Sequence, residues 1–79
     1  MEVTILTPIT KRTVTVAWVE ANTPTGNYII QLGHAPMILV LSPNKDLIFH
    51  LPNGKQEIIN VKDGLLEVTR TTTTAILDQ

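Results

Sequence analysis

The sequence contains no cysteine, and tryptophan, tyrosine and phenylalanine each occur only once among its 79 residues. Without cysteine, neither a disulfide framework nor a thiolate metal site can reinforce the fold. The two histidines, His34 and His50, are sixteen residues apart, and no carboxylate cluster stands near either of them at metal-ligand spacing. We therefore predict no metal site and no other cofactor.

Neither sign of charge is in excess, because six Lys and Arg residues face seven Asp and Glu residues. Nucleic-acid-binding modules usually carry a basic surplus, so we exclude a nucleic-acid partner. The longest uncharged stretch is interrupted by three prolines and two glycines, which is incompatible with a membrane-spanning helix. The N-terminus has no basic segment followed by an apolar core, so we predict neither a signal peptide nor a transmembrane segment.

Residues suited to covalent or phosphate chemistry are also sparse. Ser42 is the only serine and precedes Pro43 in a predicted turn, and the threonines of residues 69–74 are typical of a β-strand. The four glycines stand singly and none opens a predicted helix, which argues against a phosphate-binding loop. We predict a protein that is not an enzyme.

What the sequence does contain is β-branched residues, since 28 of the 79 residues are Thr, Ile or Val. These residues disfavour helix and pack well on a pleated surface. Turn-forming residues recur between short apolar runs, at a spacing typical of small sandwiches and barrels. We predict an all-β domain over residues 1–79, a small antiparallel β-sandwich of about 8–10 short strands.

Three runs in the first half of the chain indicate individual strands. Residues 13–20 alternate, with Val14, Val16 and Trp18 on one face, and predict one half-buried strand. Residues 28–32 and 37–41 are apolar on nearly every position, which is typical of strands covered on both sides. Such strands are central in a sheet, or one of their faces is an interface.

The second half of the chain predicts a meander. Residues 47–51 and 55–61 flank Asn53-Gly54, a dipeptide that favours a two-residue hairpin turn. Asp63-Gly64 repeats this pattern before residues 65–69, so residues 47–69 are expected to form three consecutive antiparallel strands. The threonine-rich run at 71–77 is the last predicted strand.

The segment at residues 33–36 is expected to be a rigid corner. Gly33 permits a positive φ, and Pro36 keeps Ala35 out of the helical region. The corner would present His34 from a fixed backbone. Two interpretations of His34 remain open: a surface histidine hydrogen-bonded to the backbone, or a residue that binds a partner.

Five short motifs in the same order carry a resemblance to a known family. They are Val-Thr-Ile-Leu-Thr-Pro at residues 3–8, Asn-Thr-Pro-Thr-Gly-Asn-Tyr at 22–28, Gly-His-Ala-Pro-Met at 33–37, Asp-Gly-Leu-Leu-Glu-Val at 63–68 and Thr-Ala-Ile-Leu-Asp at 74–78. From end to end, the sequence resembles the N-terminal β-sandwich of the epsilon subunit of F-type ATP synthases, the counterpart of the mitochondrial delta subunit.

The resemblance implies a non-catalytic subunit of the rotating central stalk, which clamps the γ subunit and contacts the c-ring so that rotation is coupled to ATP synthesis. It implies a monomer when isolated, peripheral to the membrane through the complex, at the cytoplasmic face of a bacterial inner (plasma) membrane. By position in the family, the c-ring contact would be made by Thr25, Gly26, Asn27 and Tyr28. The γ contact would be made by His34, Ala35, Pro36 and Met37.

The sequence also departs from the family pattern. Asn27 replaces an acidic residue, which puts one expected c-ring contact in question, and Leu32 replaces a proline before the corner. Family members usually continue into two C-terminal helices that restrain ATP hydrolysis, and we expect no such role from these 79 residues. An alternative that these departures leave open is a free-standing β-sandwich adaptor that has kept the fold alone.

Overall fold

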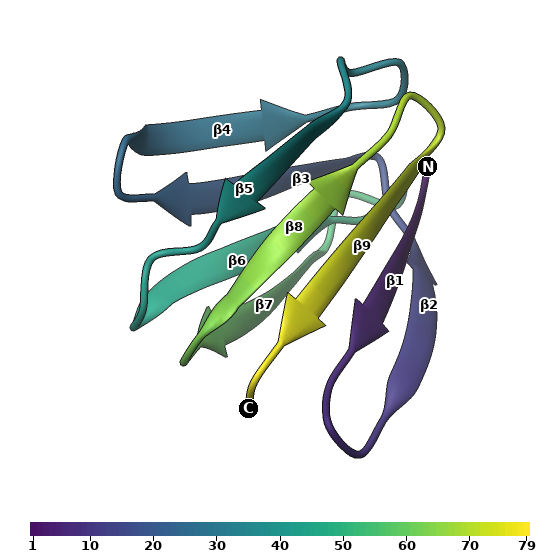
Figure 1. Ribbon diagram of the computed structural model, residues 1–79. Coiled ribbons are helices and arrows are strands. Elements are labelled where there is room, and N and C mark those ends of the chain that lie inside the picture. Colours follow the sequence, from purple (N-terminus) through teal and green to yellow (C-terminus); the bar gives the residue numbers. More distant parts are fainter.

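The computed structural model describes residues 1–79 and consists of nine β-strands with no helix (Figure 1). In chain order the strands are β1 (Glu2–Leu6), β2 (Lys11–Thr15), β3 (Trp18–Thr23), β4 (Gly26–Ile30), β5 (Met37–Val40), β6 (Lys45–His50), β7 (Gln56–Val61), β8 (Gly64–Val68) and β9 (Thr72–Leu77). Five strands form one sheet in the order β2-β1-β9-β8-β5, and four form the other in the order β4-β3-β6-β7. The predicted all-β sandwich is confirmed, except that β1 and β9 pair in parallel within otherwise antiparallel sheets.

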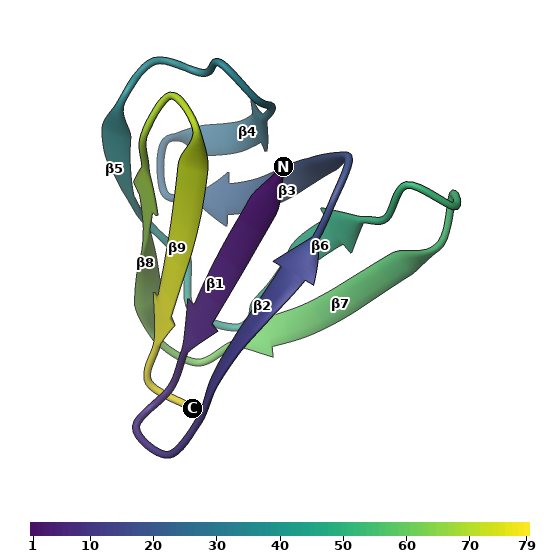
Figure 2. The same cartoon turned by 90° about the vertical axis from the view of Figure 1, so that its right-hand side faces the viewer.

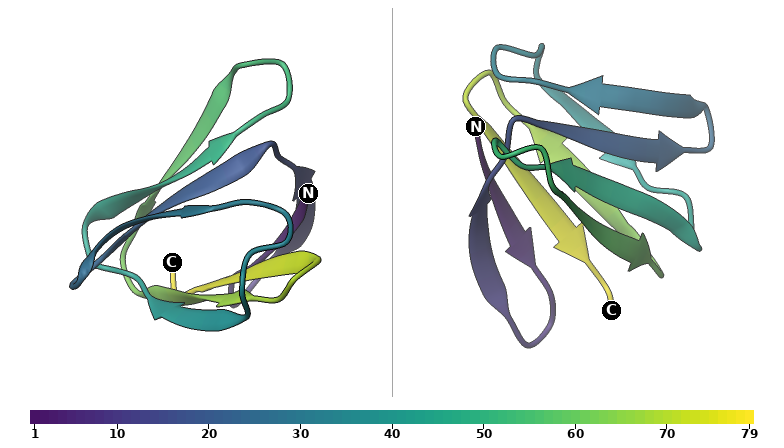
Figure 3. Two further views of the ribbon diagram at one scale, coloured as in Figure 1. Left: turned by 90° about the horizontal axis from the view of Figure 1, so that it is seen from above. Right: turned by 180° about the vertical axis from the view of Figure 1, so that it is seen from behind.

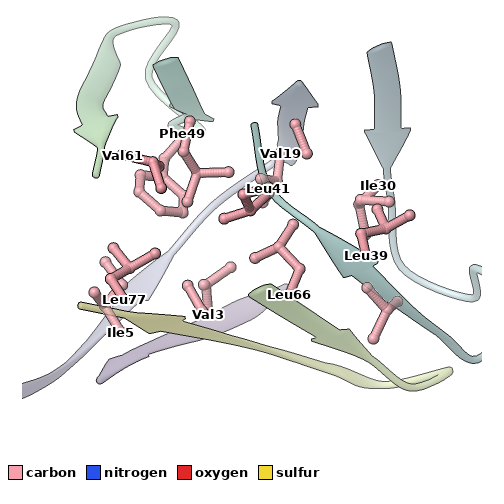
Figure 4. Close-up of a cluster of buried hydrophobic side chains, with 14 of the residues drawn as sticks. Val3, Ile5, Val19, Ile30, Leu39, Leu41, Phe49, Val61, Leu66 and Leu77 are labelled. Carbon is pink, nitrogen blue, oxygen red and sulfur yellow. The ribbon is translucent and has the colours of Figure 1, made fainter. Parts of the chain in front are cut away.

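The core lies between the two sheets and is built from side chains at alternate positions of the strands (Figure 4). Phe49 of β6, Leu66 of β8 and Val3 of β1 are fully buried there. A buried side chain of this size contributes roughly 1.5–3 kcal/mol by leaving water. Because the chain has no cross-link, this apolar layer is the main source of stability.

The prediction of one strand over residues 13–20 is wrong. Val16 donates its N–H to Met1 O at 2.8 Å in the five-stranded sheet, whereas Ala17 donates to His50 O at 2.7 Å in the four-stranded sheet. The chain therefore changes sheets between these two residues, seen from behind in Figure 3. The bend places Val16 and Val19 in the core, although three positions separate them.

The predicted three-stranded meander is also wrong beyond its first hairpin. β6 and β7 pair as expected, but β8 pairs with β5 and β9 in the other sheet. The residues between β7 and β8 carry the chain across the sandwich instead of reversing it. Asp63-Gly64 thus stands where the chain passes from one sheet to the other, and β8 hydrogen-bonds to β5 and β9 instead of β7.

The β6–β7 hairpin does not use the predicted two-residue turn. Leu51 donates its N–H to Lys55 O at 2.8 Å, and Gly54 donates to Leu51 O at 3.0 Å, so three residues form the loop. Only Gly54, with φ of 86°, adopts the left-handed conformation, whereas a two-residue type I′ turn would require it of Asn53 as well.

The two most apolar strands are edge strands and not the central ones expected. β4 ends the four-stranded sheet and β5 ends the five-stranded sheet, and both lie on the same side of the sandwich (Figure 2). Ile29 of β4 is 43% exposed, and Ile38 and Val40 of β5 are 67% and 62% exposed. The second expectation for these strands, that one face is an interface, remains a prediction.

Candidate functional site

The first candidate surface is the tip of the β3–β4 hairpin. Thr23 pairs with Gly26, which leaves Pro24 and Thr25 as a two-residue turn. The Thr23 hydroxyl donates to Gly26 O at 2.9 Å and accepts the Thr25 N–H at 3.2 Å. Because Pro24 fixes its own φ and Thr23 satisfies the turn's polar groups, the tip is a stiff projection.

The four residues expected at this surface point in different directions. Thr25 and Gly26 are exposed at the tip, whereas Tyr28 is half-buried and points inward, with its hydroxyl 3.3 Å from Thr25 Oγ1. Asn27 lies on the outer side of the sheet, where its Nδ2 donates to Glu20 Oε2 at 3.2 Å and to Asn22 Oδ1 at 3.1 Å. The Asn27 carboxamide is therefore engaged within its own sheet.

The second candidate surface is the corner between β4 and β5. Gly33 has φ of 84°, and His34 donates its N–H to Gln31 O at 3.1 Å, which closes a tight turn. Gly33 also donates its N–H to Arg70 O at 2.8 Å, so the corner is tied to the β8–β9 turn. The rigid corner expected from the sequence is confirmed.

The histidine at this corner has a defined orientation. His34 Nδ1 lies 2.8 Å from Ala35 O, and because a carbonyl only accepts, Nδ1 carries the hydrogen. His34 is half-buried, while Ala35 and Pro36 are exposed. The structure thus confirms that His34 is hydrogen-bonded to the backbone. Its second ring nitrogen, Nε2, is available for another contact.

A groove of about 390 Å³ runs along the side of the sandwich where β4 and β5 end the two sheets. Its lining comes from the β3–β4 hairpin and from the whole of β5: Thr23, Pro24, Thr25, Tyr28, Met37, Ile38, Leu39 and Val40. Most of this lining is apolar, and no Lys, Arg, Asp or Glu takes part. The groove suits the apolar side chains of another protein better than a charged small molecule.

The groove brings together residues from both expected surfaces but not all of them. Thr25 and Tyr28 of the first surface line it with Met37 of the second. Gly26 and Asn27 do not line it, and neither do His34, Ala35 and Pro36, which form the corner at the other end of β4. The two surfaces therefore form one side of the molecule, with the groove between its projecting tip and its corner.

The structure offers no arrangement for metal or membrane-spanning chemistry on this side. No group of three or more His, Cys, Asp or Glu side chains gathers anywhere in the molecule. None of its elements is a helix that could cross a bilayer. What the site provides is shape and apolar area on stiff loops, which are properties of a protein-binding surface.

Comparison with known families identifies the domain. The model of the ATP synthase delta/epsilon chain β-sandwich domain matches residues 1–79, the whole of the sequence. This chain belongs to the ATP synthase delta/epsilon β-sandwich family. Its tip and corner motifs therefore stand in a known fold, and the resemblance read from the sequence is confirmed.

Solved structures agree on the fold. A chain of the Euglena gracilis mitochondrial ATP synthase, in its OSCP/F1/c-ring structure, matches with a TM-score of 0.89 and 18% identity over 98% of the present chain. A chain of the Tetrahymena thermophila mitochondrial ATP synthase central stalk and c-ring matches with a TM-score of 0.80 and 21% identity over 100%. At these low sequence identities, the structural similarity establishes the fold alone.

The delta/epsilon domain described here spans only part of those chains, 49% of the Euglena chain and 63% of the Tetrahymena chain. None of the curated protein sequences matches it. The family is therefore established by the domain model and the fold by the structures.

Two features of this delta/epsilon domain are not predicted by its sequence. Ile38 and Val40 are exposed on the outer side of β5, and their sequence signature is the unbroken apolar run that we interpreted as a central strand. The Trp18 ring stacks on His50, with centroids 3.4 Å apart and planes 9° from parallel. Only the strand register, which pairs these two residues directly, reveals that contact.

Proposed function

We propose that this delta/epsilon domain is a non-catalytic part of the central stalk, or rotor, of a proton-translocating F-type ATP synthase. The single observation that carries the proposal is the family match, which covers all residues from 1 to 79. The domain would clamp the γ subunit and contact the c-ring, so that ring and γ turn together. It would be peripheral to the membrane and held there by these partners.

The proposed contacts with the c-ring and with γ lie at opposite ends of the groove. The tip residues Thr25 and Gly26 are exposed at the end of the β3–β4 hairpin and would meet the polar loops of the c-ring. The corner residues His34, Ala35 and Pro36 would meet γ, with Met37 and Tyr28 presenting apolar surface between them. A stiff tip and a stiff corner suit torque transmission because a flexible loop would absorb the rotation.

The proposal also specifies the membrane at which the complex is located. We place it at the cytoplasmic face of a bacterial plasma membrane, whereas both solved structures are of mitochondrial enzymes. Immunogold labelling or fractionation of the source cells distinguishes the two compartments. Recovery of the chain in mitochondria would replace the bacterial assignment and leave the rotor function unaffected.

The experiment that tests the rotor function is binding of the purified chain to its own γ subunit and c-ring, measured by co-purification and by titration. We expect a complex with γ that the Tyr28→Ala variant weakens, because the variant removes an aromatic lining of the groove. Thr13→Ala on the exposed outer side of β2 is the matched control and should bind like the native chain. Failure of the native chain to bind γ or the ring would overturn the proposal.

A further inference from the structure

The outer face of the four-stranded sheet is a separate surface, defined here by the side chains that point away from the core. Cross-strand pairing places these side chains on one face: Asn27 and Ile29 of β4, Trp18, Glu20 and Asn22 of β3, Asp46, Ile48 and His50 of β6, and Gln56, Ile58 and Asn60 of β7. Of this set only Asn27 belongs to the surfaces discussed above. No residue of the set lines the groove.

A row of three isoleucines and one glutamate crosses this outer face from edge to edge. The register aligns Ile29 with Glu20, Glu20 with Ile48, and Ile48 with Ile58. Ile29 is 43% exposed and Ile58 is 52% exposed, so the row is not covered by other parts of the chain. Beside it lies the Trp18–His50 stack, which adds an aromatic surface.

The outer face carries carboxylates but no Lys or Arg. Its carboxylates are those of Glu20 and Asp46, and its one imidazole, that of His50, lies beside Glu20. The six cationic residues are all placed elsewhere, on β2, at the core-side positions of β6 or in loops: Lys11, Arg12, Lys45, Lys55, Lys62 and Arg70. The face therefore combines isoleucines and a tryptophan with uncharged polar side chains and two carboxylates, and it carries no Lys or Arg.

Glu20 is held within this row, between Ile29 and Ile48. Its Oε2 accepts from Asn27 Nδ2 at 3.2 Å, and its Oε1 lies 3.5 Å from His50 Nε2. The Glu20 side chain keeps 28% of its surface exposed, and a carboxylate has about four acceptor positions. A preoriented, partly exposed carboxylate among isoleucines is thus available to a cation delivered from outside.

We propose that this outer face docks an amphipathic helix of a partner protein, whose apolar stripe carries one Arg or Lys opposite Glu20. Charge complementarity selects the partner, because the face supplies two carboxylates and no Lys or Arg. A helix suits the site because sheet faces are commonly covered by helices. Four strands about 4.8 Å apart span roughly 19 Å, the length of a helix of about 13 residues.

The docking site goes beyond the proposed rotor contacts, which use the tip, the groove and the corner. Isoleucines alone would not fix the position of the helix along the row, since they pack against many apolar side chains equally well. The central carboxylate sets the register by requiring the cation at one position along the stripe. The Trp18–His50 stack then limits the helix on one side of that position.

The test uses the complete chain and two synthetic helical peptides of about 14 residues. Both carry a leucine stripe, with Arg at the central stripe position in one and norleucine in the other. Trp18 is the only tryptophan of the protein, so its emission reports binding at this face directly. We expect the Arg peptide to bind roughly three- to tenfold more tightly than the norleucine peptide.

The Glu20→Gln variant should abolish that difference while it leaves binding of the norleucine peptide unchanged. Glu67→Gln, an exposed glutamate on the outer side of the other sheet, is the matched control and should preserve it. Backbone amide shifts in NMR should move in β3 and β6. The proposal is overturned if the preference for Arg survives in Glu20→Gln, if the shifts map to the five-stranded sheet, or if Trp18 instead reports self-association of the chain. None of these outcomes depends on whether the chain binds γ.

Discussion

The two long sides of the sandwich differ in how their edge strands meet. On one side Arg12 of β2 reaches across to Glu57 of β7 with both terminal guanidinium nitrogens, and its Nη1 lies 3.4 Å from Glu57 Oε1. On the other side β4 and β5 leave a groove of about 390 Å³. We refer to these as the closed side and the open side.

The difference arises at equivalent positions. Arg12 and Glu57 occupy core-side positions of their edge strands, as the pairs with Ile5 and Phe49 show. Tyr28 occupies such a position on the open side, and Met37 does so on β5. The Arg12–Glu57 pair bridges the gap between β2 and β7 and is still in contact with water. Tyr28 and Met37 do not bridge the gap between β4 and β5, and their apolar surface stays half-exposed. A free-standing domain gains nothing from that exposure, so the open side is the one suited to a partner.

The largest effect should come from Phe49→Ala, which removes the biggest fully buried side chain. Figure 4 shows Phe49 beside Val61, near the β7 end of the four-stranded sheet. Such a substitution costs about 3–5 kcal/mol because a cavity remains, a large share of the stability of a small domain. Urea unfolding followed by circular dichroism measures the loss. A cost below about 1 kcal/mol would mean that the closed side is not the rigid half of the molecule.

A smaller loss of stability is expected from Met37→Ala on the open side. Met37 is only half-buried, so the free energy of unfolding should fall by about 1–2 kcal/mol. Because Met37 lines the groove, affinity for γ should fall by more than the stability change accounts for in a fully folded sample. Isothermal titration of folded protein makes the measurement. Unchanged affinity would remove the groove from the γ contact.

The extent to which the sequence predicts the fold depends on the difference between local patterns and long-range contacts. Local rules identify most strands, because alternation and turn residues act within a few positions of the chain. They fail at Val16 and Ala17, where a continuous strand-like run changes sheets, since only the hydrogen-bond partners Met1 and His50 separate its halves. Sheet membership depends on contacts far apart in the sequence, and no local pattern encodes it.

The candidate site was predictable to a similar degree. The corner followed from Gly33 and Pro36, whose backbone preferences are local. The groove did not, because a strand that is apolar on both faces reads the same at a sheet centre and at an uncovered edge. For Met37 and Tyr28 the sequence predicted interface residues, and the structure adds that they share one groove.

His34→Ala sharpens the comparison at the corner of the open side. The variant deletes one hydrogen bond, from Nδ1 to Ala35 O, at a half-buried position. We expect a stability loss of about 1 kcal/mol, the usual net value of such a bond. Binding of γ should weaken while the far-ultraviolet circular dichroism stays native. If the variant unfolds, His34 is a structural residue of the corner and leaves the list of γ contacts.

The smallest effect is expected where the closed side looks most firmly held. The Arg12 and Glu57 side chains are 48% and 35% exposed, so water and salt screen their attraction. A double-mutant cycle of Arg12→Ala and Glu57→Ala should give a coupling energy of about 0.5 kcal/mol, and less at high salt. Because Glu57 is paired with the fully buried Phe49, a coupling this small would show that packing of the core keeps β2 and β7 together, and that the ion pair adds little. A coupling above about 2 kcal/mol would reverse that order and make charge the reason why one side is closed and the other open.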